Sequence, residues 1–351
     1  MTNLPRLPLA AAFAFLAAGC GLEPAPRLDA PRDSTPVAGM PGAGLSLNGT
    51  AVTLETGPER TDECWSESSR AGTPLPSGVC HNGPLLSGLL ASVNLSQVTL
   101  VDGPLDGPAT LGGTVFSGTV GGVPKQGTGF VGALLTGTLD TGGTVQVRID
   151  SALQGSGSDP DVWEYVFSYK VGESWPSVCA GGVRAIPVLG RWDYSQGTST
   201  GGDKISDSTV FTVGCQGSAV AKCVNAGYKP WATASGVSLD SYHQACVRMI
   251  RADYCGNGSS YTSPNRLINI RDNLGIQIDG EGWFLEAKWT PAGARCASAT
   301  NRNLVGGVLC SPVGTLSCLL ESPFAGGTLL ISETPLLGGV LGGPGVSTLP
   351  Q

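Results

Sequence analysis

A helical spacing of hydrophobic residues marks the stretch from Leu239 to Cys255. One face of this segment is apolar and the other is polar, as expected for an amphipathic helix with one buried side. The apolar face comprises Leu239, Tyr242, Cys246, Met249 and Ile250. Ser238 is placed to cap this helix and Gly256 to end it. A shorter helix is predicted from Ser218 to Asn225. The glycine and the Lys-Pro pair that follow it mark its end.

Four cysteines in and around these two segments have spacings that predict disulfides. Cys215 lies eight residues before Cys223, and Cys255 lies nine residues after Cys246. Each step covers roughly 12 to 14 Å along a helix, which is too far for a bond within one helix. In an antiparallel helical hairpin, Cys223–Cys246 and Cys215–Cys255 can form together. We favour these pairs over Cys215–Cys246 with Cys223–Cys255.

Short β strands are predicted on both sides of the hairpin. From Leu45 to Gln154, apolar and polar residues alternate and glycines stand at the turns, which indicates antiparallel strands. Three strands are expected after the hairpin, with Asp272-Asn273 as the turn between the first two. These strands span Arg266 to Arg271, Gly275 to Ile278 and Trp283 to Trp289. The predicted fold class is therefore α+β: a disulfide-rich domain with a stapled helical hairpin packed on antiparallel strands, preceded by a Gly-rich antiparallel β region.

Four aromatic residues occupy one face of a strand between Asp161 and Lys170, because they alternate with other residues. They are Trp163, Tyr165, Phe167 and Tyr169. Such a row is a possible ligand-binding platform on which sugar rings stack. We favour the other interpretation, in which the rings fill the core beneath the hairpin, because aromatic side chains supply much of the buried area of a core.

The first twenty residues have the pattern of a secretory signal, with Arg6 followed by an apolar run from Leu9 to Ala18. The segment Leu16 to Cys20 resembles a bacterial lipobox, with Ala17 where leucine is usual, which implies lipidation of Cys20 and a membrane as partner. The alternative is an ordinary secretory signal. By analogy with bacterial sorting, glycine after the cysteine favours the outer membrane. The Pro-rich stretch over residues 21–44 is predicted to be a disordered tether.

Three segments together resemble a known family. They are Ala221 to Trp231 (AKCVNAGYKPW), His243 to Met249 (HQACVRM) and Arg251 to Gly256 (RADYCG). They are similar to the ADYC domain of exported bacterial proteins, notably myxobacterial ones, which is named after the tetrapeptide at Ala252 to Cys255. The resemblance extends from about Asp161 to Cys296 through the sequences WPSVC, GRWDY and FLEAKW. It implies a fold and an exported location, and no activity.

The remaining cysteines complete a predicted disulfide framework. Ten cysteines remain after Cys20, and an even number suits an oxidising location in the envelope or outside the cell. Cys64–Cys80 and Cys310–Cys318 are expected as local pairs, which leaves Cys179–Cys296 to tie the start of the ADYC-like domain to its end. The predicted parts are a signal with lipobox (1–20), the tether (21–44), the Gly-rich β region (45–157), the ADYC-like domain (158–300) and a low-charge C-terminal appendage (301–351).

The sequence assembles no catalytic constellation. As a general base His243 would need a nucleophile, and the chain contains no nucleophile motif. His243 is therefore interpreted as a hydrogen-bonded structural residue. Two carboxylate pairs could be arranged as in a glycosidase, Asp253 with Glu286 and Asp159 with Asp161. The sequence does not give the distance between the two carboxyl groups of either pair. No metal-ligand spacing occurs, so we predict no metal, cofactor or catalytic residue.

The charge bounds the choice of partners. The net charge is −7, and the 20 Lys and Arg residues form no basic stripe, so nucleic acid is not an expected partner. The leading hypothesis is a non-catalytic surface binding or structural module with an unknown envelope or extracellular ligand. The alternative is a secreted hydrolase that acts on a polysaccharide or a peptide.

Asp253, in the tetrapeptide itself, is predicted to be a structural clamp. On a helix extended to Cys255 it falls on the apolar face and in the last turn, where a carboxylate opposes the helix dipole. A buried carboxylate in that position requires a charged partner. The candidates are Arg191, Arg248 and Arg295, and we prefer Arg191 because Arg248 lies on the opposite face of such a helix. The clamp then joins the hairpin to the β section.

The lipid anchor can be tested directly. Replacement of Cys20 by serine removes the thiol that receives the lipid, so Cys20→Ser protein is expected to be released from the membrane or to stay unprocessed. Detergent phase partitioning and the mass of the mature N-terminus measure this. Unchanged processing and membrane association in the variant would contradict the lipobox.

Overall fold

This computed structural model describes residues 52–54, 90–140, 142–156, 159–179, 182–261, 266–278, 283–298, 301, 310 and 317–334. Within them the fold is mostly β, with antiparallel sheets and two helices longer than one turn. The predicted signal, lipidation site Cys20, tether and Cys64–Cys80 pair lie outside the described residues.

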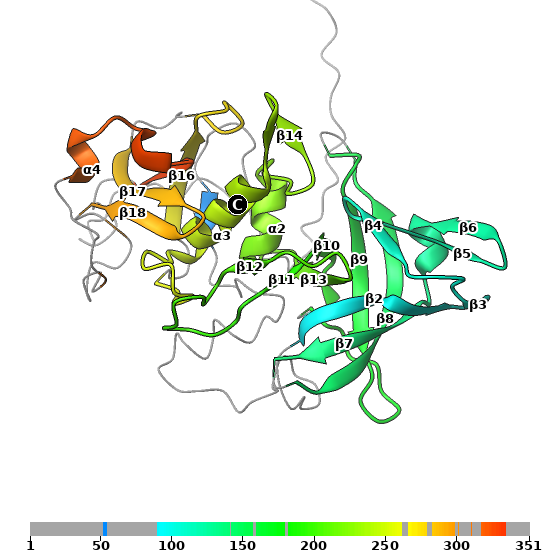
Figure 1. Cartoon of the computed structure of the whole chain (residues 1–351). Coiled ribbons are helices and arrows are strands. Elements are labelled where there is room, and N and C mark those ends of the chain that lie inside the picture. The colour runs from blue at the N-terminus through cyan, green and yellow to red at the C-terminus, as the bar shows by residue number, and fades with distance from the viewer. Residues whose placement is uncertain are drawn as a thin grey trace, which may run out of the picture. The chain divides into compact units, whose positions relative to one another are not determined.

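Six antiparallel strands close on themselves into a ring (Figure 1). The ring is closed because the last strand pairs with the first as well as with its neighbour in the sheet, at Val210↔Asn94 and Phe211↔Val93. In spatial order the strands are β13 (Val210–Cys215), β10 (Ala185–Leu189), β9 (Trp163–Tyr169), β8 (Thr144–Gln154), β7 (Leu134–Leu139) and β2 (Leu90–Leu100). A two-residue strand, β3 (Gly103–Pro104), extends the sheet beyond β2.

The aromatic row of β9 lies in the core of this closed sheet. Tyr165, Phe167 and Tyr169 are at most 2% exposed, whereas Trp163 is only partly buried. The ring of Phe116 lies 5.0 Å from that of Tyr165, centroid to centroid. The core interpretation therefore holds for the three buried rings, but their location beneath the helical hairpin was wrong. The clustered rings instead fill the interior of the sheet.

A three-stranded sheet supplies Phe116 to this core. It consists of β4 (Thr110–Gly112), β5 (Val115–Val120) and β6 (Val123–Gln126), followed by the 3-10 helix η1 (Gly127–Phe130). Phe130 of η1 also contacts the Phe116 ring, at 5.6 Å between centroids.

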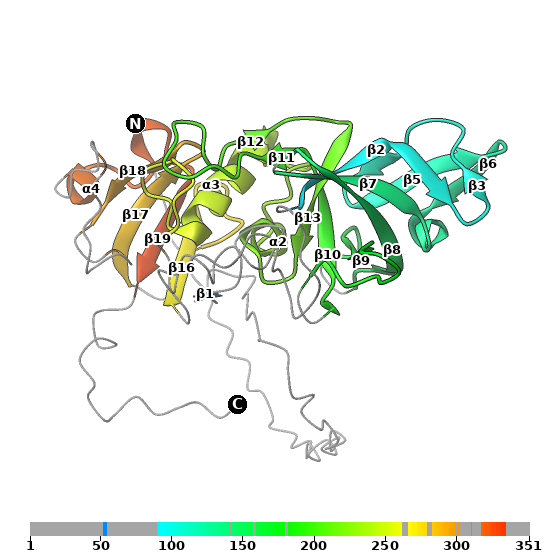
Figure 2. The ribbon, with the colours of Figure 1, turned by 90° about the horizontal axis from the view of Figure 1, so that it is seen from below.

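A second antiparallel sheet has the order β1-β16-β19-β17-β18 (Figure 2). Its strands are β1 (Val52–Leu54), β16 (Arg266–Asp272), β17 (Phe284–Thr290), β18 (Gly293–Ala297) and β19 (Leu330–Thr334). β19 pairs with β16 on one side and β17 on the other, so it is an internal strand. The prediction of a C-terminal appendage over 301–351 was therefore wrong for this segment, because Leu330–Thr334 is a largely buried strand paired on both sides.

The predicted boundary between residues 157 and 158 also does not coincide with a break in the fold. It falls between β8 and β9, which are paired neighbours from Val147↔Tyr169 to Gln154↔Trp163. The Gly-rich β region and the start of the ADYC-like domain therefore share one sheet.

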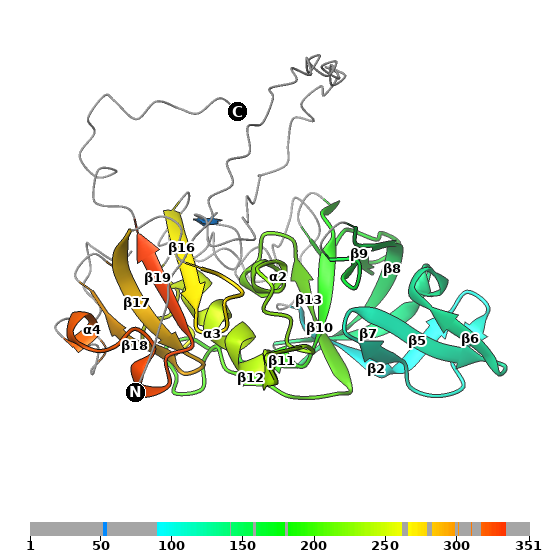
Figure 3. The same ribbon diagram turned by 90° about the horizontal axis from the view of Figure 1, so that it is seen from above.

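Two helices and several short elements connect the sheets. Helix α2 spans Ala219–Asn225, and the Ser218 hydroxyl caps it by accepting a hydrogen bond from the Ala221 N–H at 3.3 Å. Helix α3 spans Asp240–Arg251 and lies against the sheet of β16, β19 and β17 (Figure 3). The short elements are β11 (Arg191–Trp192), β12 (Lys204–Ile205), β14 (Thr233–Ala234), β15 (Val237–Ser238), α4 (Ser317–Leu320) and η3 (Ala325–Gly327).

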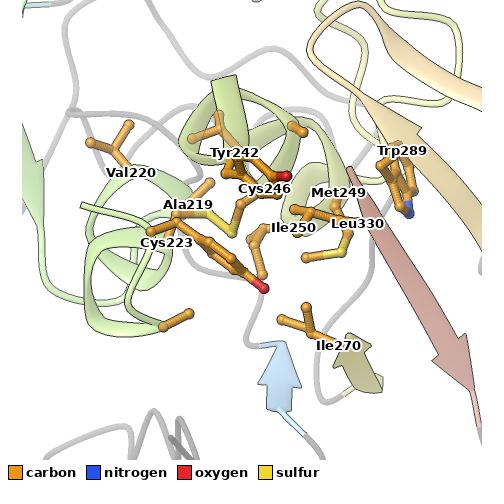
Figure 4. Packing of buried hydrophobic residues seen from close by; sticks show 14 of the residues in the cluster. Ala219, Val220, Cys223, Tyr242, Cys246, Met249, Ile250, Ile270, Trp289 and Leu330 are labelled. Atoms are coloured by element: carbon orange, nitrogen blue, oxygen red, sulfur yellow. A yellow bond between two sulfur atoms is a disulfide. The ribbon is translucent and has the colours of Figure 1, made fainter. Parts of the chain in front are cut away.

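The apolar face of α3 lies in a second core around the Cys223–Cys246 disulfide (Figure 4). The predicted apolar face is buried and packs on side chains from α2 and from the second sheet. Those partners include Val220, Ile270, Trp289 and Leu330. This disulfide joins α2 to α3 with a Cα separation of 5.8 Å, as the favoured pairing proposed. The expectation of a single buried side was wrong, because Gln244, Arg248 and Arg251 on the predicted polar face are buried as well.

Helix α3 ends four residues before Cys255. Ala252 adopts the left-handed conformation, with φ 54°, and its N–H donates to the carbonyls of Arg248 and Met249. This local cap ends the helix ahead of the predicted stop at Gly256. The chain then turns away from the helix axis, which changes the direction of every side chain from Asp253 onward.

The other cysteine pairings differ from the predicted ones. Among the described residues the further disulfides are Cys179–Cys215, Cys255–Cys310 and Cys296–Cys318. The predicted pairs Cys215–Cys255, Cys179–Cys296 and Cys310–Cys318 were therefore wrong. Cys215 ends strand β13, and Cys255 follows the turn after α3, so neither lies on a helix as the spacing argument assumed.

His243 is fully buried in α3, and its Nε2 lies 3.1 Å from the carbonyl oxygen of Val220 in α2. This agrees with the interpretation of a hydrogen-bonded structural residue. Burial, reinforced by the positive charge of Lys204, lowers the pKa of His243 from 6.5 to about 3, although the Val220 bond opposes the shift.

This burial predicts acid sensitivity. In the unfolded chain this histidine is protonated below about pH 6.5, whereas in the folded protein it stays neutral down to about pH 3. The free energy of unfolding therefore has its full value above pH 6.5 and decreases as the pH falls from 6.5 toward 3. We expect the free energy of unfolding of the wild type, measured by denaturant titration, to decrease between pH 7 and pH 4. In His243→Gln protein the slope of this decrease should be smaller by up to about 1.4 kcal/mol per pH unit. Identical slopes in the two proteins would contradict it.

Candidate functional site

The ADYC tetrapeptide lies at the end of α3, where Asp253 forms a buried ion pair with Arg248. The two side chains are 0% and 1% exposed, and Arg248 Nη1 donates to Asp253 Oδ2. The Asp253 carboxylate also accepts hydrogen bonds from the backbone N–H groups of Asn257 (3.1 Å) and Gly258 (2.9 Å). A buried carboxylate with this many donors has its charge fully compensated.

Arg248 extends the network to two other segments. Its guanidinium donates to the carbonyl oxygens of Gly201 (2.6 Å) and Pro291 (3.2 Å) and to the carboxylate of Asp203 (2.5 Å). The predicted clamp role of Asp253 is consistent with this arrangement. The guanidinium ties α3 to the loop before β12 and to the turn between β17 and β18.

The predicted partner of the clamp, Arg191, was wrong. Arg191 is exposed on β11, and Arg295 pairs with Glu321 instead. The prediction assumed a helix that continues through Asp253, which puts Arg248 on the opposite face. Because Ala252 reverses the chain, the carboxylate returns to the side of α3 that carries Arg248.

The other residues of the motif also make contacts that stabilise the fold. The Tyr254 hydroxyl donates to Glu286 at 2.7 Å, and its ring stacks on Trp289 with centroids 5.3 Å apart. Cys255 is bonded to Cys310. A Cβ on Gly256 would lie 1.7 Å from the Ala292 carbonyl oxygen, so only glycine fits there. Asp253 and Glu286, the first candidate acid pair, therefore belong to separate structural networks.

A surface groove of about 550 Å3 lies between the three-stranded sheet, the start of β9 and the segment after α2. This volume is within the roughly 300 to 1,000 Å3 typical of ligand pockets. Two indole rings line it, from Trp163 on β9 and Trp231 in the segment between α2 and β14. Its polar lining comes from Gln126, Gln154 and Asp161.

Glycines on the neighbouring turns let the backbone approach both indole rings. A Cβ on Gly127 would lie 2.5 Å from the Trp163 ring, and one on Gly113 would lie 3.1 Å from Trp231 Nε1. Both glycines have positive φ, at +53° and +62°. The backbone N–H of Trp163 also donates to the buried Thr114 hydroxyl at 2.6 Å, which fixes the start of β9.

An ion pair holds one wall of the groove in place. Lys229 Nζ lies 2.6 Å from Asp161 and 2.9 Å from Asp159. Partial burial opposes ionisation of Asp161, but hydrogen bonds from the Lys229 and Trp231 side chains and the Lys229 charge outweigh it and lower the pKa of Asp161. The second candidate acid pair therefore shares one ammonium group, and Asp161 remains an ionised acceptor that is half exposed.

Sequence reasoning found only part of this groove. It named Trp163 for an aromatic platform whose other three members are buried, and it missed Trp231, Gln126 and Gln154. The available signal for Trp231 was its place in the segment AKCVNAGYKPW. Nothing in the spacing placed that segment beside β9.

Among the described residues, no cluster of three or more histidine, cysteine, aspartate or glutamate side chains could hold a metal ion. No helix in the same part of the chain has the length and hydrophobicity needed to cross a membrane. The disulfides indicate an extracellular or envelope protein.

The clamp predicts a large difference between two conservative substitutions. Asp253→Asn leaves the buried Arg248 with only the half-exposed Asp203 as a charged partner, so the free energy of unfolding is expected to fall by about 3 kcal/mol, the lower end of the range for a broken buried pair. Arg191→Gln is the matched control, and at an exposed position it should change stability by less than about 0.5 kcal/mol. Denaturant titration under non-reducing conditions measures both, and equal effects would refute the assignment.

The comparisons with known proteins agree with the resemblance seen in the sequence. The family model described as the ADYC domain matches residues 127–303, about half of the chain, and so begins before the predicted domain start at residue 158. The match takes in β7 and β8, which share the closed sheet with β9. No curated protein and no solved structure matches the chain. The chain belongs to the ADYC domain family.

Proposed function

We propose that this protein is an exported, lipid-anchored module of the bacterial outer membrane or cell surface that binds an envelope or extracellular ligand without catalysis. The observation that carries the proposal is the groove lined by Trp163 and Trp231, because it combines the size of a ligand site with apolar faces and a few polar groups. The lipid on Cys20 and the tether over residues 21–44 provide the attachment.

The surroundings of the groove suit binding. Its walls are built on paired strands and on a segment held by the Lys229 ion pair, so little ordering is required when a ligand enters. The helices α2 and α3, which we interpret as a hairpin stapled by Cys223–Cys246, brace the segment that carries Trp231.

The chemistry of the ADYC tetrapeptide supports a structural role for the motif. Asp253, Tyr254 and Cys255 are each committed to an ion pair, a hydrogen bond or a disulfide. A general acid or a nucleophile has to reach a substrate, and these three side chains contact other parts of the fold.

The test combines retention with turnover. Purified mature protein is incubated with insoluble envelope polymer and with soluble polysaccharide and peptide substrates, and the products are followed by mass spectrometry. Retention on the polymer with no product is the expected result. Product that increases with protein concentration and disappears in folded Glu286→Gln or Asp161→Asn protein would replace this proposal with the hydrolase.

A further inference from the structure

We infer that the groove between Trp163 and Trp231 binds a neutral glycan, that is, a chain of uncharged pyranose sugars. This inference rests on the proposed binding function and names its ligand class.

The indole rings supply flat apolar surface to a ligand. Trp163 and Trp231 are both partly buried and both line the groove, although they come from sequence positions far apart. The C–H groups on the face of a pyranose ring are the part of a sugar that packs on an aromatic ring. Indole offers a large rigid surface for such packing at a small cost in conformational entropy.

The polar groups suit hydroxyls, which both donate and accept hydrogen bonds. Gln126 and Gln154 are exposed amides with a donor and an acceptor each. The Gln154 amide nitrogen donates to the Pro160 carbonyl at 2.9 Å, which directs the side chain along the groove wall. Asp161 is an ionised, half-exposed acceptor, so beyond its bonds with Lys229 and Trp231 it has lone pairs to accept a hydrogen bond from a sugar hydroxyl.

The local charge distinguishes among ligands that contain rings. Asp159 and Asp161 share the single ammonium of Lys229, so the groove has no excess positive charge. Phosphate or carboxylate groups on a nucleotide or an acidic polysaccharide are repelled here. A proline-rich peptide also packs on aromatic grooves, but its proline residues have no N–H to donate to the amide oxygens of Gln126 and Gln154. A neutral glycan meets all three conditions.

The test uses the mature protein with soluble neutral oligosaccharides of glucose, mannose, galactose or N-acetylglucosamine. Isothermal titration calorimetry is expected to show binding of at least one of them, with Trp231→Ala and Trp163→Ala each weakening it at least about tenfold. Trp175→Ala is the matched control, because this indole packs on Arg148, 4.3 Å from its guanidinium carbon, and does not line the groove. Its affinity should stay within about twofold of wild type.

Trp163 packs near Tyr165, so its removal can disturb the core. Gln126→Ala, at an exposed position on β6, tests the polar contacts without this risk and should also weaken binding. Thermal unfolding of each variant verifies that it is folded.

Three results would overturn the inference: no binding of any neutral oligosaccharide, binding unaffected by Trp231→Ala and Gln126→Ala, or preference for oligogalacturonate or a proline-rich peptide over every neutral sugar. If retention on envelope polymer persists in that case, the binding function stands and only the ligand class is wrong. Cleavage of the bound oligosaccharide would instead overturn the proposed function.

Discussion

The buried ion pair between Arg248 and Asp253 is the interaction on which the second half of the fold depends. An isolated charge in a protein interior is costly, and this pair is stable only because backbone donors and carbonyls satisfy both partners. Those backbone groups come from the loop before β12, the turn after α3 and the β17–β18 turn. The ion pair therefore determines where three loops lie, and the Cys255–Cys310 disulfide holds the same turn covalently.

The sequence predicted local features well and long-range contacts poorly. The existence of helices α2 and α3 depends on neighbours within a few residues, and both helices are present. The pairing of Cys215 failed because it depends on whether the chain before α2 is helical or extended. Hydrophobic spacing over so short a stretch does not distinguish the two. The prediction of the partner of Asp253 was wrong because of a single residue, Ala252. Ala252 adopts the left-handed conformation, which is not expected for alanine from sequence.

The candidate site was predictable only in part for the same reason. Trp163 is visible as one end of an alternating aromatic row, but alternation gives a face and does not say whether that face is covered. Closure of the ring by β13 and β2 is the long-range event that buries Tyr165, Phe167 and Tyr169 and leaves the first ring at the edge. Topology thus determines which member of the row is only partly buried.

The ADYC tetrapeptide and the groove occupy separate parts of the fold. The tetrapeptide is used inside the fold, where its side chains hold loops together. The groove lies elsewhere, where β9 meets the segment after α2, and its indole rings are only partly buried. A fixed interior with a separate open groove allows the groove residues to change without loss of the clamp, since side chains that share no partners contribute to stability almost independently. Members of one fold family can in this way differ in ligand while they keep the same internal motif.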